Sequence, residues 1–250
     1  MGHTLIFQHT DKSINYLSRT TVFGPESKIV YEFLNATKEK YDIGQGDYAV
    51  FLEPLLDTGV PDIVVVKYRK KTFEQNWNSY RNILLNVDLK ILNYMTSTMS
   101  YKYNDFVQML GISKHNLNKS LDRLLHANLV RQCSNNNWHN KSMNTIWGIQ
   151  SISAIEAKIK ECSSAVNQAE MNLWFANESC VLFPNHRISK RIIDSVSSKR
   201  MGVITIDNQK GIKTIIKPFR TKGPSSYASW LFNEWIGRKL FSIGETNDSF

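Results

Sequence analysis

The chain has 250 residues, of which 42% are hydrophobic, enough for one large or two modest globular domains. Its 31 basic and 22 acidic side chains give a formal net charge of +9, which favours a polyanionic partner such as nucleic acid. No apolar run approaches the roughly 20 residues that a membrane span needs, and the amino terminus does not have the pattern of a signal peptide. We therefore expect a cytoplasmic protein without a membrane partner. Three cysteines without C-x-x-C spacing argue against a zinc site or a disulfide framework.

The first third of the chain predicts a helix followed by two strands. Pro25 and Glu26 suit the start of a helix, because proline is favoured at the first helical position and the apolar residues that follow recur at helical spacing. Residues 48–54 and 62–68 are rich in β-branched or aromatic side chains and are bounded by turn residues, which predicts two strands.

The stretch 79–150 has a different pattern, in which three segments with apolar side chains at helical spacing precede two short strands. This order is that of a winged helix-turn-helix, and the stretch closely resembles that family. Gly111, which ends the second helix, and the leucine-rich third helix carry the likeness. The predicted helices cover 84–95, 103–110 and 114–126, and the predicted strands cover 128–132 and 145–149.

Beyond residue 150 strands alternate with helices again, as apolar β-branched runs give way to segments of helical periodicity. Tyr227–Leu240 is rich in tryptophan and predicts a buried closing helix. The remaining predicted strands are 151–160, 179–183, 202–206 and 212–216, and the predicted helices are 163–176 and 190–196.

Two strand-borne acidic motifs indicate the chemistry. Asp62 follows Pro61 at the start of one predicted strand, and Glu156-Ala157-Lys158 lies on another. Because the side-chain period of a strand is two, Glu156 and Lys158 point to the same face. A carboxylate and an ammonium on one face, opposite a second carboxylate, can hold Mg²⁺ and direct a water molecule at a phosphate.

With these acids, the order of helices and strands outside 79–150 resembles the PD-(D/E)xK nuclease superfamily, most closely its restriction-endonuclease-like and Holliday-junction-resolvase-like members. The likeness covers about 20–68 and 150–217. It implies an α+β fold, an α/β sandwich with a restriction-endonuclease-like core and an inserted winged helix-turn-helix. The implied domains are a discontinuous nuclease-like domain of 1–78 and 150–250 and a winged helix of 79–149. The departure is the insertion itself, because family members usually pass from the Asp strand to the Glu-x-Lys strand through a short hairpin.

The resemblance implies a site that binds Mg²⁺ or Mn²⁺. The implied catalytic residues are Asp62, Glu156, Lys158, Glu26 and Gln168, and the implied metal ligands are Asp62, Glu156 and Glu53. Each also has a purely structural interpretation. Asp62 would be a turn residue, Glu156 and Lys158 would lie on a solvated strand face, Glu26 would be favoured by the helix dipole, Glu53 would be a strand-edge charge, and Gln168 would lie on an exposed helix face.

The third helix of the winged-helix stretch carries polar and basic side chains that could reach bases or phosphates in a major groove. The alternative is a protein-binding or merely solvated helix face. The predicted DNA-binding residues are Lys114, His115, Asn116, Asn118, Lys119, Arg123 and, on the wing, Lys141, with Arg131 and His139 extending the surface.

Together these features predict a metal-dependent DNA endonuclease targeted by its winged helix, in phage defence, restriction, recombination or mobile-element processing. Two alternatives stay open. One is a non-catalytic winged-helix regulator or replication initiator, and the other is a nuclease subunit that is active only within a larger complex. Cleavage of both DNA strands by a subunit with one site would favour a homodimer.

Overall fold

A computed structural model describes residues 3–19, 24–42, 46–97, 102–133, 137–184, 188–207 and 211–247. The chain forms two compact units. Unit 1 comprises residues 1–69 and 149–225, and unit 2 comprises residues 70–148 and 226–250. Within the described ranges, no helix has both the length and the apolar character that crossing a membrane requires.

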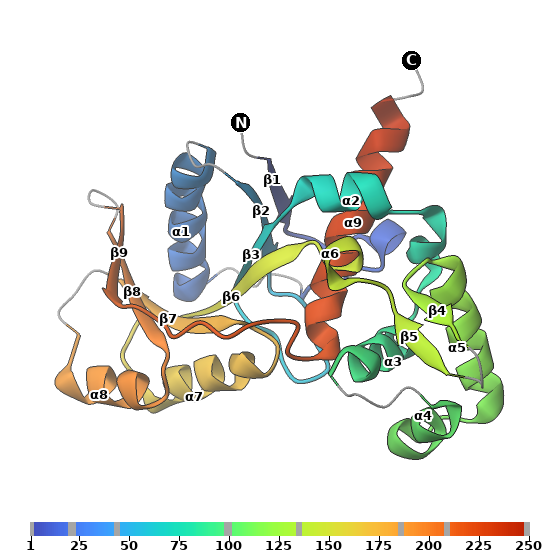
Figure 1. Cartoon of the computed structure of the whole chain (residues 1–250). Coiled ribbons are helices and arrows are strands. Elements are labelled where there is room, and N and C mark those ends of the chain that lie inside the picture. The colour runs from blue at the N-terminus through green and yellow to red at the C-terminus, as the bar shows by residue number, and fades with distance from the viewer. Residues whose placement is uncertain are drawn as a thin grey trace. The chain divides into compact units, whose positions relative to one another are not determined.

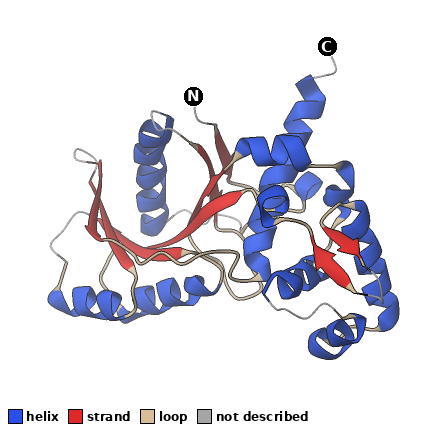
Figure 2. Ribbon diagram, in the orientation of Figure 1, coloured by secondary structure: helices blue, strands red, loops and turns tan. Residues whose placement is uncertain are grey.

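Unit 1 is a mixed α+β unit built on a seven-stranded sheet in the order β1-β2-β3-β6-β7-β8-β9. Its central strands β3 and β6 are antiparallel, and β7 and β8 follow in parallel to β6 (Figures 1 and 2). Parallel neighbours need crossover connections, and the helices supply them. The strands are β1 (Thr4–Phe7), β2 (Asp47–Leu52), β3 (Ile63–Tyr68), β6 (Ile149–Ala157), β7 (Glu178–Pro184), β8 (Gly202–Asp207) and β9 (Gly211–Ile216).

Helices cover both faces of this sheet because its strands carry apolar side chains on both sides. On one face, Phe33 and Leu34 of α1 pack against strand residues that include Ile155 and Leu182. On the other face, α7 and α8 cover Val181 and its neighbours. The helices of unit 1 are η1 (Lys12–Ile14), α1 (Pro25–Asp42), α7 (Ser163–Met171), η4 (Asn172–Trp174) and α8 (Lys190–Ser198).

The insertion between β3 and β6 begins and ends at neighbouring positions. Tyr68 and Ile149 are register partners on the two antiparallel strands, so the chain leaves the sheet and re-enters it side by side. This geometry lets a long segment replace a hairpin turn, because the entropy of loop closure rises only slowly with loop length.

Unit 2 consists of helices and a two-stranded hairpin. Its elements are α2 (Lys70–Asn76), η2 (Ser79–Ile83), α3 (Asn86–Ser97), α4 (Tyr103–Leu110), α5 (Lys114–His126), β4 (Val130–Gln132), β5 (Trp138–Asn140), α6 (Met143–Ile146) and α9 (Tyr227–Asn247). The three helices expected from the sequence correspond to α3, α4 and α5. The prediction of a strand at 145–149 is wrong, because β4 pairs with β5 at 138–140 and residues 143–146 are helical.

The carboxyl-terminal helix belongs to unit 2, although the sequence placed 226–250 in the nuclease-like domain. Buried Glu234 of α9 pairs with buried Arg81, with Nε and Nη2 of Arg81 lying 3.0 and 2.5 Å from the two carboxylate oxygens. Asn233 accepts a 2.9 Å hydrogen bond from the backbone N–H of Gly148. Trp230 is fully buried against Trp147. These long-range contacts have no signature in the local sequence pattern.

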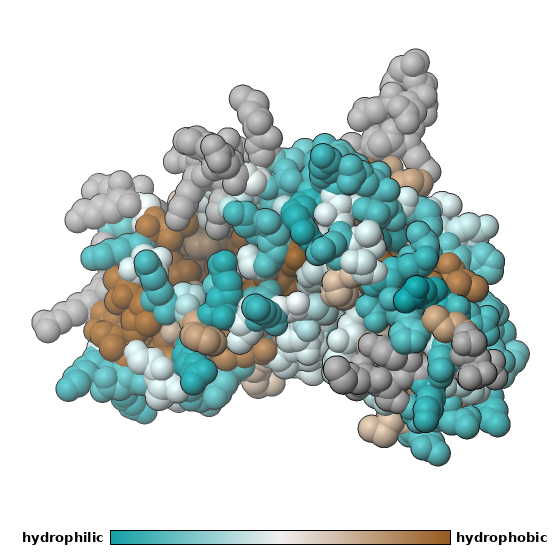
Figure 3. All heavy atoms as spheres, viewed as in Figure 1, coloured by the Kyte–Doolittle hydropathy of each residue, from teal (hydrophilic) through white to brown (hydrophobic). Residues whose placement is uncertain are grey.

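Unit 1 contains two hollows. Figure 3 shows hydrophobic atoms gathered over the β7–β9 part of the sheet. One hollow, of about 550 Å³, is lined by apolar side chains that include Phe33, Val65 and Ile204, and also by Glu178 and Arg220. The other, of about 460 Å³, lies beside the acidic residues that the sequence singles out. The second hollow is therefore the one that contains residues of the predicted site.

Candidate active site

The antiparallel register of β3 and β6 brings the two acidic motifs together. Ile63 pairs with Ile155, so Asp62, just before β3, lies next to Glu156 near the end of β6. The backbone N–H of Ala157 donates a 2.8 Å hydrogen bond to Asp62 Oδ2. Burial raises the pKa of Glu156, and the carboxylate of Asp62 is close enough to raise it further. The insertion therefore leaves the two acids of the predicted site next to each other.

Both carboxyl groups are withdrawn from water, with Asp62 8% and Glu156 4% exposed. Burial and the neighbouring Asp62 raise the pKa of Glu156 to about 8. Burial also raises the pKa of Asp62, although the ammonium of Lys158 partly opposes this rise. Two adjacent buried carboxyls cannot both ionise easily, so the pair retains a proton at neutral pH unless a cation joins it.

Lys158 extends over this pair from the residue just after β6. Its Nζ lies 3.8 Å from Asp62 Oδ2 and 3.3 Å from Oε2 of Glu26, in the first turn of α1. Burial lowers the pKa of Lys158, but the carboxylates of Asp62, Glu26 and Glu156 outweigh that effect and raise it. Lys158 is therefore a charged ammonium held beside the acids, and Glu26 reaches the site through it.

Asn172, which the sequence analysis missed, completes the surroundings of Glu156. Asn172 is buried at the start of η4, directly after α7, and its side-chain Nδ2 donates a 2.7 Å hydrogen bond to Glu156 Oε1. Gln168, the predicted residue, is exposed on α7, four residues earlier. The parallel pairing of Glu156 with Val181 turns Glu156 toward the α7 face, and only this placement distinguishes Asn172 from Gln168.

Glu53, a predicted metal ligand, is instead engaged by Arg19. Arg19 Nε and Nη2 donate to the two carboxylate oxygens of Glu53 at 3.1 and 3.0 Å. Arg19 Nη2 also lies 4.0 Å from Asp62 Oδ1. Glu53 therefore lies beside the site with its charge already paired, and Arg19 is a second site residue that sequence reasoning missed.

Asp62 and Glu156 are the two side chains of this site that could bind a metal ion. Among the described residues, no three His, Cys, Asp or Glu side chains are grouped so that they could hold an ion. Mg²⁺ is nevertheless commonly held by one or two carboxylates, with waters and substrate phosphate oxygens completing its octahedron. The oxygen donors of Asp62 and Glu156 thus suit Mg²⁺ or Mn²⁺ better than zinc, whose protein sites are built mostly from nitrogen and sulfur ligands.

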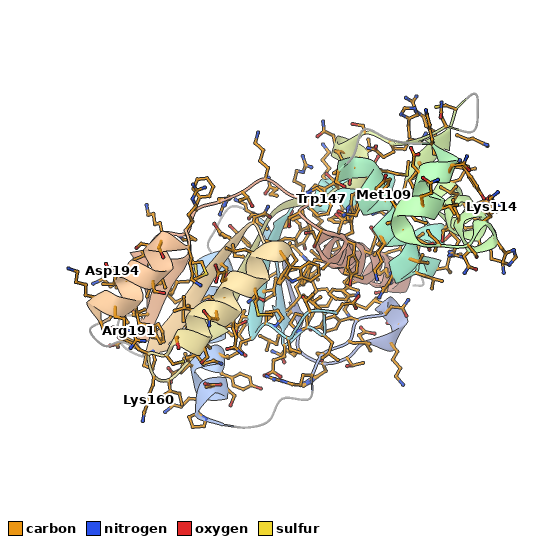
Figure 4. The ribbon with its side chains drawn as sticks, turned by 90° about the horizontal axis from the view of Figure 1, so that it is seen from below. Met109, Lys114, Trp147, Lys160, Arg191 and Asp194 are labelled. Carbon is orange, nitrogen blue, oxygen red and sulfur yellow. The ribbon has the colours of Figure 1, made fainter. Side chains whose placement is uncertain are left out.

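The predicted DNA-binding side chains of α5 fall into two groups. Lys114, His115, Asn116 and Lys119 are exposed, and Figure 4 shows Lys114 at the outer surface of unit 2. Arg123 is different, because it donates through two nitrogens to buried Asp88 at 2.8 and 2.7 Å.

Asn118 is exposed but accepts a 2.7 Å hydrogen bond from Tyr103, and Lys141 is half-buried after β5. Arg131 is exposed on β4, and His139 is half-buried on β5. The polar face of α5 is thus shorter than predicted, because Arg123 stabilises the packing of α5 on α3.

Comparisons with known proteins identify no relative: no family model, curated protein or solved structure matches the chain.

Proposed function

We propose that this protein is a metal-dependent deoxyribonuclease of the PD-(D/E)xK type. It would be an endonuclease that hydrolyses phosphodiester bonds in an active site formed by Asp62, Glu156 and Lys158. The observation that carries the proposal is the juxtaposition of Asp62 and Glu156 at the neighbouring strands β3 and β6, with the ammonium of Lys158 3.8 Å from Asp62 Oδ2. A carboxylate pair with only a structural role would destabilise the sheet interior, because burial of a charged group is unfavourable without full compensation.

Asp62 and Glu156 would hold Mg²⁺ or Mn²⁺. When bound, such an ion polarises the phosphoryl oxygen and lowers the pKa of a coordinated water. The chain's own residues prepare the site in three ways. Asn172 and the Ala157 N–H orient the two carboxylates, and burial excludes bulk water from them.

Lys158 would stabilise the negative charge that develops on the phosphate and orient the attacking water, since its ammonium is fixed beside the pair. Glu26 holds that ammonium at 3.3 Å and thereby limits its rotation. Gln168 has no comparable support, because it is exposed on α7.

The topology of unit 1 supports the family resemblance. A helix, α1, precedes the antiparallel strands β2, β3 and β6, and α7 then leads to the parallel strand β7. This is the order of the superfamily's core. The α3–α5 helices and the β4–β5 hairpin of unit 2 follow the order of a winged helix-turn-helix, which would present α5 to duplex DNA.

The decisive experiment is incubation of supercoiled plasmid with the protein in Mg²⁺, Mn²⁺ or EDTA. Nicking or linearisation that needs the metal, and that is lost in Glu156→Gln and Asp62→Asn, would support the proposal. Glu170→Gln is the matched control, because Glu170 is an exposed acid of α7 that pairs with Lys199.

No cleavage, with a retained gel shift of duplex DNA, would argue instead for a DNA-binding regulator or initiator. Cleavage that begins only when a cellular extract from the source is added would indicate a subunit of a larger complex. Size-exclusion chromatography with light scattering would show whether the protein is a homodimer.

A further inference from the structure

Arg19 is fixed beside the carboxylate pair by contacts that the roles of Asp62, Glu156 and Lys158 do not need. Its backbone N–H donates to the carbonyl of Glu53 at 2.9 Å, and its side chain forms the two-point ion pair with the Glu53 carboxylate. Glu53 in turn donates its backbone N–H to the carbonyl of Asp62 at 3.1 Å. Backbone and side-chain bonds thus set the position of the guanidinium relative to Asp62.

Arg19 and Lys158 approach Asp62 from different sides. Arg19 Nη2 is 4.0 Å from Oδ1, whereas Lys158 Nζ is 3.8 Å from Oδ2. A phosphodiester at this site would carry negative charge on two non-bridging oxygens. Lys158 alone would leave one side of the phosphate without a charged donor. Arg19 supplies a second cation on that side.

The Arg19 guanidinium is also open to a ligand. Its side chain is 52% exposed and lines the hollow of about 460 Å³, together with Glu26, Tyr31 and Asp62. The ion pair with Glu53 uses Nε and Nη2 of Arg19, and Nη1 donates no hydrogen bond within the described part of the chain. A planar guanidinium with free donors matches phosphate oxygens better than a point charge does.

We propose that Arg19 is a substrate-binding residue of this site that contacts a phosphate of the cleaved strand on the Oδ1 side of Asp62, with Glu53 as its positioning residue. The inference rests on the proposed nuclease function and adds to it the residue that orients the phosphate.

The same unit contains a matched control. Arg220 makes an equivalent two-point pair with Glu178, at 3.0 and 3.0 Å, and its side chain is 59% exposed, against 52% for Arg19. Arg220 lines the other hollow, not the one that contains Asp62. Loss of charge and loss of a surface ion pair are therefore the same in Arg19→Ala and Arg220→Ala.

The first measurement is the cleavage rate of a duplex oligonucleotide at saturating protein. We expect Arg19→Ala to lower the rate about 100-fold, as the loss of a preorganised charge donor does, while Arg220→Ala stays within about twofold of the natural protein. Arg19→Lys should recover only part of the rate, because lysine lacks the planar fork. The double variant Arg19→Ala/Glu53→Gln removes the unpaired Glu53 charge, and it should remain slow.

The second measurement does not need cleavage. In the Glu156→Gln protein, the affinity for the duplex is measured by fluorescence anisotropy between low and moderate salt. Loss of one phosphate contact should reduce the slope of log affinity against log salt by about one. We expect this reduction for Arg19→Ala and not for Arg220→Ala. Arg19→Gln replaces the alanine variant if thermal melting shows that the latter does not fold.

These two measurements separate failure of this inference from failure of the proposed function. A natural protein that never cleaves DNA with Mg²⁺ or Mn²⁺ contradicts the function, and the salt slope then decides whether Arg19 binds phosphate. An Arg19→Ala protein whose salt slope equals that of Arg220→Ala overturns the inference, even if its cleavage rate is reduced.

Discussion

Ala157 donates its backbone N–H to the side chain of Asp62, 2.8 Å away, although the two residues lie 95 positions apart in the chain. The bond joins the two halves of the acidic motif directly, across the antiparallel register of β3 and β6. The geometry of the site thus depends on strand pairing in unit 1 and not on the segment inserted between the strands.

Lys158→Met should lower the rate of DNA cleavage by about two to three orders of magnitude, because it removes a preorganised cation from the reacting phosphate. Lys160→Met is the control, since Lys160 is exposed two residues later, and Figure 4 shows it at the surface of unit 1. Both variants lose one positive charge, so the net charge of the protein is the same in the two. Equal cleavage rates in the two variants would show that Lys158 acts only through the general charge of the surface.

Asn172→Ala should weaken Mg²⁺ binding by about 10- to 100-fold, because outer residues that orient metal ligands contribute this much to affinity. Its Nδ2 is the buried donor to Glu156 Oε1, and without it the Glu156 carboxylate is both less stable and free to rotate. Isothermal titration calorimetry with Mg²⁺ or Mn²⁺ gives the affinity. Asn167→Ala, an exposed asparagine of α7, should leave it unchanged. The role of Asn172 is refuted if its variant and the Asn167 variant bind the metal alike.

The metal-free protein should become less stable as the pH rises from about 5 to 8. The pKa of Glu156 is about 8 in the folded protein, against 4.5 ordinarily, because it is buried beside Asp62. Within this window the folded state keeps a proton that the unfolded state has lost, so the free energy of unfolding falls with pH. Above about pH 8 both states are ionised and the fall ends. Urea unfolding at pH 5, 6, 7 and 8 measures the trend.

Glu156→Gln is the control for this trend, because an amide does not titrate. Its free energy of unfolding should depend on pH less than that of the natural protein and should exceed it at pH 8. Added Mg²⁺ should stabilise the natural protein more at pH 8 than at pH 6, since the proton no longer competes. A parallel pH dependence in both proteins would place the titrating group elsewhere.

Glu234→Ala should destabilise unit 2 by about 3–5 kcal/mol, because it leaves the Arg81 guanidinium buried without its partner. Both side chains of this pair are at most 2% exposed. Glu74→Ala, which breaks an exposed pair with Lys70 four residues away, should cost less than about 1 kcal/mol. Urea unfolding followed by tryptophan fluorescence suits the comparison, since Trp230 and Trp235 lie in the same helix as Glu234. Equal midpoints would mean that the Arg81–Glu234 pair does not stabilise the unit.

The local sequence pattern was sufficient to predict most helices and strands and to single out the candidate acids. The β-branched run of 62–68 and the apolar periodicity of 114–126 correspond to β3 and α5. Strands and amphipathic helices repeat their apolar positions with a fixed period, and this period is visible without knowledge of the partners. The same logic failed for 145–149, where a short apolar run is compatible with either a helix or a strand.

The sequence by itself determined that Asp62, Glu156 and Lys158 are the candidate residues, because their types and their two-residue spacing carry the chemistry. Only the tertiary structure decided that Asn172 rather than Gln168 contacts Glu156, that Glu53 pairs with Arg19, that Arg123 is held by Asp88, and that α9 belongs to unit 2. The physical reason is the range of the interactions. Periodicity and residue type are local properties, whereas a hydrogen bond or an ion pair between distant residues depends on how strands pair and helices pack.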